Sequence, residues 1–184
     1  MQLAESPEVG KVLIGAEGIQ AKIAELGAAI SHDYAGKDPL LVGVLKGMVL
    51  FMADLIRAIS IPLEVDFMAI SRYGPETEAL GVVRVIKDLD KGIEGRHVLF
   101  VEDIIDTGLT LGYLLRILRA RGPASLAVCT LLDRSVRRLI DIDIAYKGFD
   151  LPDVFVVGYG LDYRQRFRNL PYIAELRPVR PMRG

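Results

Sequence analysis

The sequence has little of what several classes of protein require. Its single cysteine, Cys129, permits no internal disulfide, which fits the reducing cytoplasm and predicts that location. The apolar neighbours of Cys129 predict a core residue rather than a nucleophile. No apolar run approaches the roughly 20 residues that cross a bilayer, and the first residues lack the basic and apolar segments of a secretion signal. We therefore expect no membrane association.

An excess of positive charge is also missing. The sequence has 23 Lys and Arg residues and 24 Asp and Glu residues, which gives a formal net charge of −1. Proteins that bind nucleic acid need a basic surface for the phosphates, so we expect no nucleic-acid partner. Repeats, low-complexity tracts and Ser/Gly linkers are absent too, and the 184 residues, 51% of them apolar, predict one domain over residues 1–184.

Apolar periodicity predicts strands and helices in alternation. Strands are expected at 40–45, 63–70, 82–86, 97–101, 125–132 and 154–158, and helices at 15–34, 48–59 and 109–120. This order predicts an α/β fold, in which helices flank a largely parallel central sheet. Ligands of such sheets gather beyond the carboxyl ends of the strands, so we expect the functional residues there.

The stretch from Val98 to Thr110 is the most informative. Its apolar first half ends at two adjacent carboxylates, Glu102 and Asp103, and a third carboxylate, Asp106, precedes a helix. Carboxylates at the end of a buried strand are costly without partners, so they should face a polar ligand or a metal. The backbone N–H groups after Asp106 can surround a phosphate at the helix N-terminus, and Gly108 permits close approach.

A plainer interpretation is that Asp106 only caps the helix and that Thr110 is a first-turn residue. Capping does not require the two further acids on the strand, which favours a ligand site. The stretch is neither a Walker loop nor a Gly-x-Gly-x-x-Gly loop.

Residues 101–110 resemble the phosphoribosyl pyrophosphate (PRPP) signature of the purine phosphoribosyltransferases. Three further segments resemble the hypoxanthine-guanine branch of that family: 45–47 its pyrophosphate loop, 71–74 its mobile hood loop, and 154–163 with 168–172 its purine pocket and C-terminal end. The likeness covers about residues 10–176. It implies the phosphoribosyltransferase fold, with a core of about 10–176, a small hood from the N-terminal part and about 150–184, and a mobile loop of about 71–82.

The resemblance implies a magnesium-dependent pentosyltransferase. It would transfer the 5-phosphoribosyl group of PRPP to N9 of a 6-oxopurine, hypoxanthine or guanine, giving IMP or GMP and pyrophosphate in purine salvage. The transition state would resemble an oxocarbenium ion, so that positioning and electrostatics dominate the rate enhancement. Asp106 would be the general acid/base at purine N7. A homodimer or homotetramer is implied as well, and the bond between Leu45 and Lys46 is expected to be cis.

The resemblance also assigns the remaining site residues. Contacts to PRPP and its phosphates are implied for Lys46, Gly47, Glu102, Asp103, Asp106, Thr107, Gly108, Leu109, Thr110 and Arg168. Purine contacts are implied for Ile105, Arg134, Val154, Phe155, Val156 and Asp162. The mobile loop would contribute Ser71, Arg72 and Tyr73, and magnesium would be held by Glu102, Asp103 and Asp162.

Two positions depart from the family pattern. Arg134 stands where the family usually has a lysine that donates to the purine 6-oxo group. Arginine still donates, but its planar fork is not equivalent, so the ranking of hypoxanthine, guanine and xanthine stays open. Arg72 either adds charge beside the pyrophosphate or faces solvent.

Two other functions are less consistent with the sequence. A PRPP-sensing regulator of the same fold would need a basic face or an added DNA-binding domain, and the sequence indicates neither while it retains Asp106. An enzyme acting on adenine or uracil is disfavoured by Phe155-Val156 and Leu161-Asp162, which favour a 6-oxopurine.

Overall fold

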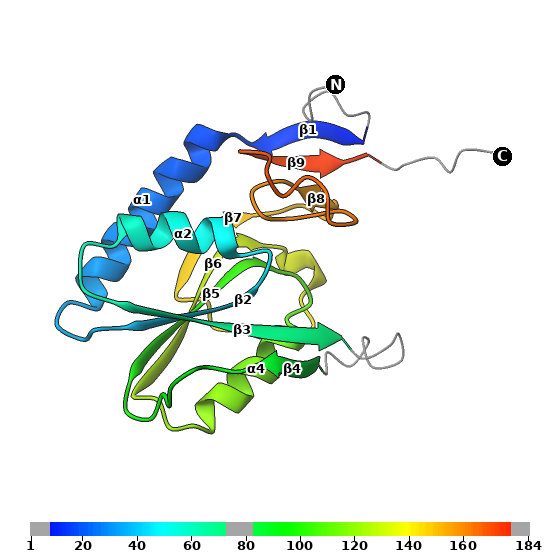
Figure 1. The fold of residues 1–184 in the computed structure, drawn as a ribbon. Coiled ribbons are helices and arrows are strands. Elements are labelled where there is room, and N and C mark those ends of the chain that lie inside the picture. Colours follow the sequence, from blue (N-terminus) through cyan, green and yellow to red (C-terminus); the bar gives the residue numbers. More distant parts are fainter. Residues whose placement is uncertain (1–7, 73–82, 178–184) are drawn as a thin grey trace.

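The computed structural model describes residues 8–72 and 83–177, whose strands form two sheets (Figure 1). The larger sheet has six strands in the order β4 (Val83–Lys87), β3 (Glu64–Arg72), β2 (Leu40–Leu45), β5 (His97–Ile105), β6 (Ser125–Asp133) and β7 (Tyr146–Asp150). Neighbouring strands pair in parallel except β3 with β4, which are antiparallel. The predicted α/β fold with a largely parallel sheet is thus confirmed.

Helices cover both faces of this sheet. In Figure 1, α1 (Ala16–Asp33) and α2 (Val49–Ala58) lie on one side and α4 (Leu109–Arg119) on the other. Strand β5 is apolar on both faces because Leu99 and Val101 join the core under α1 and α2, while Val98 and Phe100 join the core under α4. Among the described residues, no helix is long and apolar enough to span a membrane.

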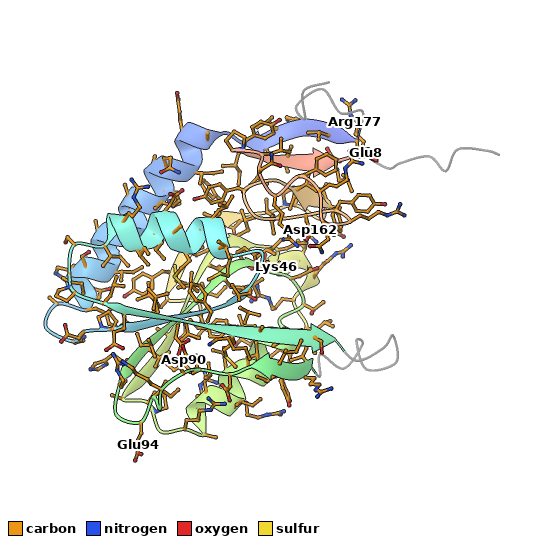
Figure 2. All side chains as sticks on the ribbon, in the orientation of Figure 1. Glu8, Lys46, Asp90, Glu94, Asp162 and Arg177 are labelled. Carbon is orange, nitrogen blue, oxygen red and sulfur yellow. The ribbon has the colours of Figure 1, made fainter. Side chains whose placement is uncertain are left out.

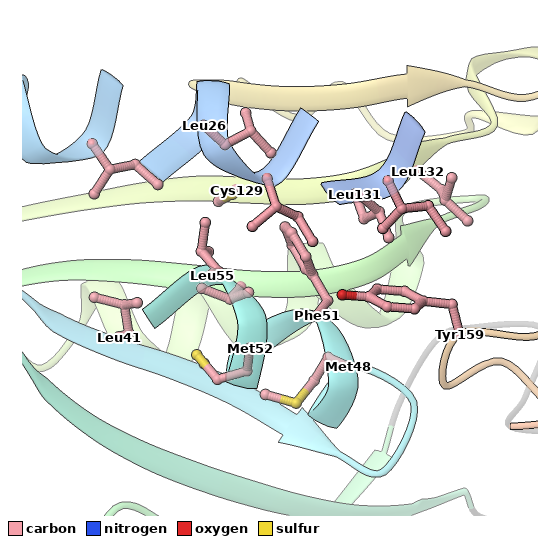
Figure 3. Close-up of a cluster of buried hydrophobic side chains, with 14 of the residues drawn as sticks. Leu26, Leu41, Met48, Phe51, Met52, Leu55, Cys129, Leu131, Leu132 and Tyr159 are labelled. Carbon is pink, nitrogen blue, oxygen red and sulfur yellow. The ribbon is translucent and has the colours of Figure 1, made fainter. Parts of the chain in front are cut away.

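Cys129 lies inside the core beneath α1 and α2. Figure 3 shows it on β6, close to Leu55 of α2 and Leu26 of α1. It is fully buried, and this burial raises the pKa of its thiol far above the usual range. The prediction that Cys129 is a core residue rather than a nucleophile is confirmed.

The smaller sheet joins segments from opposite ends of the sequence. Its order is β1 (Val9–Ile14), β9 (Ile173–Leu176) and β8 (Val156–Val157), all antiparallel. A separate apolar cluster of Val9, Val157, Phe167, Leu170 and Ala174 holds it together. The strand predicted at 154–158 is therefore only two residues long and belongs to this sheet rather than to the parallel one.

Strand β5 is longer than its apolar run. The sequence predicts a strand that ends at Val101, but β5 continues to Ile105, and Glu102 pairs with Thr130 of β6. Glu102 and Asp103 thus lie in the last part of the strand rather than beyond it. Ladder hydrogen bonds involve the backbone alone, so a strand can continue under polar side chains that face a cleft.

Candidate active site

A cleft of about 830 Å³ opens where the carboxyl ends of β2 and β5 face the loops of the smaller sheet. Fourteen of the predicted site residues line it: Gly47, Glu102, Asp103, Ile105, Asp106, Thr107, Gly108, Leu109, Thr110, Arg134, Phe155, Val156, Asp162 and Arg168. Figure 2 labels Lys46 and Asp162 near one another in the middle of the view, whereas Glu94 lies at the lower end of the molecule. Segments distant in the sequence therefore meet in one cleft.

The other predicted site residues either do not line the cleft or fall outside the described residues. Lys46 and Val154 are not among its lining residues, and neither is Ser71, which pairs with Arg84 of β4. The backbone of Arg72 ends strand β3, and its side chain is outside the description. Tyr73 falls outside the described residues, as does most of the predicted loop of about 71–82. Apolar residues to which the sequence assigned no ligand contact complete the lining: Ile70, Val83, Ile104, Leu111, Leu139 and Leu161.

The adjacent carboxylates Glu102 and Asp103 form the floor of the cleft. Burial, together with the charge of neighbouring Asp103, raises the pKa of the Glu102 carboxyl well above its usual range. Burial also raises the pKa of Asp103, although the Ile104 N–H donates to its Oδ1 at 2.8 Å and opposes the shift. Such a pair is stabilised by a cation or by hydroxyl donors.

The loop at residues 45–47, at the end of β2, lies against this pair of carboxylates. The Leu45–Lys46 bond is cis, as expected from the resemblance. A Cβ atom on Gly47 would overlap the Asp103 carboxylate, and a Cβ on Gly160 would overlap the Gly47 carbonyl oxygen. Because the main chain of Gly47 lies against the Asp103 side chain and against the main chain at Gly160, the loop is held between the acidic pair and the segment that follows β8.

Residues 106–110 form the turn that leads into α4. The N-cap position is Gly108, with φ 82°, and the described structure gives it no side-chain capping bond. Asp106 is therefore not the N-cap, which excludes the plainer interpretation of this residue. On its outer side the turn is held by the N–H of Leu139, which donates to the Thr107 carbonyl at 2.9 Å. The Leu109 N–H donates to Thr107 Oγ1 at 3.4 Å, and the next N–H groups of α4 lack intrahelical partners and can face an anion in the cleft.

Asp106 and Arg134 form an ion pair in the lining of the cleft. Arg134 is buried, its Nη1 lies 3.4 Å from Asp106 Oδ2, and its Nη2 donates to the Val154 carbonyl at 2.6 Å. Asp106 Oδ1 and Arg134 Nε are buried without a hydrogen-bond partner among the described residues. Buried polar atoms normally have partners, so these two atoms indicate a ligand that supplies both a donor and an acceptor.

Arg138 supports this arrangement, and the sequence analysis missed it. Its Nε donates to the Asp106 carbonyl at 3.1 Å, and its guanidinium forms an ion pair with the buried carboxylate of Asp133. The short 3₁₀ helix Ser135–Arg137 brings it there. The sequence around it is a charged run without periodicity, which by itself indicates only an exposed loop.

Asp162 and Arg168 close the far side of the cleft. Arg168 Nη2 lies 2.6 Å from Asp162 Oδ1, and its Nη1 donates to the Gly160 carbonyl at 2.7 Å. Phe155, with 54% of its surface exposed, presents its ring beside them. This side of the cleft thus combines the Asp162–Arg168 ion pair with an exposed aromatic ring.

Comparisons with known proteins agree with this geometry. Residues 15–164 match the family model described as a phosphoribosyl transferase domain. The chain is 54% identical over 177 residues to the hypoxanthine-guanine phosphoribosyltransferase of Mycobacterium avium, covering 93% of this chain and 87% of that protein. It is 53% identical to the Bacillus subtilis protein of the same name, covering 94% and 96%. A crystal structure of a hypoxanthine phosphoribosyltransferase from Staphylococcus aureus superposes with a TM-score of 0.92 at 47% identity, covering 97% of each chain.

Proposed function

The chain belongs to the phosphoribosyltransferase family, and from this premise we propose that its cleft transfers the 5-phosphoribosyl group of PRPP to N9 of hypoxanthine or guanine. The enzyme is a pentosyltransferase of purine salvage, and its products are IMP or GMP and pyrophosphate. The convergence of 14 predicted site residues on one cleft supports the assignment of its residues.

We propose that residues 106–110 bind the 5′-phosphate through backbone N–H groups and the Thr107 and Thr110 hydroxyls. The open N-terminus of α4 supports this because its first N–H groups lack intrahelical partners. The loop at 45–47 would direct its amides at the pyrophosphate, which Arg168 would contact from the other side. These groups hold the leaving group while the ribose becomes cationic.

Magnesium fits the acidic floor. Carboxylate oxygens are its preferred protein ligands, and the raised pKa values of Glu102 and Asp103 indicate that a cation would stabilise their charged forms. In the described part of the chain, Glu102, Asp103 and Asp162 do not gather into a three-ligand cluster, which suits an ion that completes its shell with substrate oxygens and water. The ion would neutralise the departing pyrophosphate, while Glu102 and Asp103 would also hold the ribose hydroxyls.

Asp106 would exchange a proton with purine N7 during the transfer. Its unpartnered Oδ1 supports this role because a protonated ring nitrogen is the donor that this atom lacks. Phe155 would stack on the purine, and Val156 would offer backbone atoms to its edge. Arg134, with an unpartnered Nε, would donate to the 6-oxo group, where relatives usually use lysine.

The finer organisation is part of the same proposal. The smaller sheet with its loops would form the hood of a single domain. The enzyme would act in the cytoplasm as a homodimer or homotetramer, which light scattering of the purified chain would test.

The reaction itself is tested with the purified chain, PRPP and each of hypoxanthine, guanine, xanthine and adenine, with and without magnesium. We expect IMP and GMP, no AMP, and no product when the metal is chelated. Absence of any nucleotide product from all four bases would contradict the proposed function.

A further inference from the structure

Tyr163 lies behind Phe155, outside the cleft. The two ring centroids are 6.1 Å apart and the rings are inclined at 82°, an edge-to-face pair. Tyr163 is not among the described residues that line the cleft, whereas Phe155 is. Any contribution of Tyr163 to base binding must therefore pass through the Phe155 ring.

Phe155 needs such support because little else restrains its ring. Its backbone is fixed, since its carbonyl accepts the Leu176 N–H at 2.8 Å, but 54% of its surface is exposed. An exposed aromatic side chain exchanges rotamers rapidly. A stacking platform must instead hold one orientation before the purine arrives.

Tyr163 is itself firmly placed. Its ring packs against the apolar cluster of the smaller sheet that contains Phe167 and Val157. On the solvent side, the Arg164 guanidinium lies over the Tyr163 ring, 5.2 Å from its centroid. Tyr163 thus connects the apolar cluster of the smaller sheet to the aromatic face of the cleft.

The backbone at Tyr163 belongs to a two-residue turn. Tyr163 and Arg166 exchange hydrogen bonds of 3.2 and 3.0 Å, and between them Arg164 and Gln165 have φ values of 52° and 64°. Positive φ at both central positions normally selects Asn and Gly, so Arg and Gln here are strained. The turn is braced because Asp162 Oδ2 accepts the Gln165 N–H at 2.8 Å and Asp162 Oδ1 pairs with Arg168.

We infer that Tyr163 is a positioning residue for the purine, which it serves by holding the Phe155 ring in its stacking orientation. The inference rests on the proposed function for the identity of the ligand. Its braced turn also connects the purine platform to Asp162 and, through it, to Arg168, the proposed pyrophosphate contact. No contact between Tyr163 and either substrate is required.

The test uses the full chain with Tyr163→Leu, which keeps an apolar side chain against the smaller sheet but removes the aromatic edge. Tyr163→Phe is the conservative variant. Tyr146→Leu is the matched control. Tyr146 forms an aromatic pair with Tyr34, whose ring centroid is 6.5 Å away, and neither residue lines the cleft. We expect Tyr163→Leu to raise the KM for hypoxanthine about three- to tenfold, with less than about a twofold change in the KM for PRPP. We expect Tyr163→Phe to retain the wild-type KM for hypoxanthine and Tyr146→Leu to leave this KM unchanged.

Equal effects of Tyr163→Leu on both substrates, or failure of Tyr163→Phe to restore the KM, would overturn the inference. Crystal structures of the unliganded variants test it without reference to turnover. Phe155 should have one ring orientation in the wild type and in Tyr163→Phe, and a rotated or multiple orientation in Tyr163→Leu. An unchanged single orientation in Tyr163→Leu would refute the positioning role. Wild-type protein that forms no nucleotide would refute the proposed function instead, while these crystal structures still decide the role of Tyr163.

Discussion

The two sides of the cleft are built in different ways. The phosphate side is built mainly on one continuous segment, from Glu102 in β5 through the turn to α4, which is rooted in the core of the larger sheet and is joined by the loop at 45–47. The base side combines Arg134, Phe155 and Asp162 from separate segments, two of which follow or flank a strand of only two residues. A continuous segment fixes its own geometry locally, whereas the base side depends on contacts between distant parts of the chain.

The largest expected effect is at Asp106, where the two sides meet. Asp106→Asn should lower kcat at least about a hundredfold, because general acid/base catalysis contributes about 10²–10⁴. The KM for PRPP should change little, since the phosphate-binding backbone is retained. Steady-state kinetics with a circular-dichroism melt as the folding control checks this. A variant within about threefold of the wild-type rate would show that Asp106 is not the proton-transfer group.

The next effect isolates the base side. Arg134→Ala should lower kcat/KM for hypoxanthine and guanine by roughly tenfold to a hundredfold, because a ligand oxygen loses a buried donor worth about 1–3 kcal/mol. The affinity for PRPP should stay near the wild-type value. Competition assays with each base measure the effect, and Arg134→Lys should retain activity with a shifted base preference. Equal losses in purine and PRPP binding would remove Arg134 from the purine pocket.

A smaller effect isolates the phosphate side. In Gly47→Ala the new methyl group would overlap the Asp103 carboxylate and push the loop away from the pyrophosphate. We expect the KM for PRPP to rise about tenfold, an effect of the size that overpacking produces, with less change for the purine. Gly92→Ala is the matched control because a Cβ there meets no atom within 4 Å. An unaltered KM for PRPP would show that the loop does not bind pyrophosphate.

The smallest expected effect concerns an ion pair that lines neither side of the cleft. Arg121 donates to both oxygens of Asp88, at 2.8 and 2.7 Å, and these bonds lower the pKa of Asp88. A carboxyl group with a lowered folded-state pKa adds stability above its unfolded pKa of about 3.9, and this is lost as the pH falls through the folded value. The pair is partly exposed, so Asp88→Asn should cost only about 0.5–1 kcal/mol at pH 7 and lower Tm by about 1–4 °C. Calorimetry at pH 7 and near pH 2.5 measures the difference, which should be smaller at the lower pH. A decrease of equal size at both pH values would exclude the ion pair as its cause.

The same contrast explains what could be predicted from the sequence. Residues 101–110 could be recognised because the carboxylates, the turn and the helix start are contiguous. The alternation of strands and helices predicted every strand of the larger sheet except β7. Strands β1 and β9 were missed because each is short and is stabilised by a partner more than 150 residues away in the chain. Arg138 and Tyr163 were missed for a related reason, since only the folded chain brings them to Asp106 and Phe155.

The pairing of β1 with β9 has a consequence for the order in which the enzyme is completed during translation. Residues 9–14 leave the ribosome early, but in the described structure their only strand partner is at residues 173–176. The segments of the larger sheet are synthesised before that partner, so the phosphate side can form while the nascent chain is still growing. The smaller sheet, which anchors Phe155, can close only after the last strand has emerged. A chain interrupted before residue 173 would therefore carry a phosphate site without a finished platform for the base.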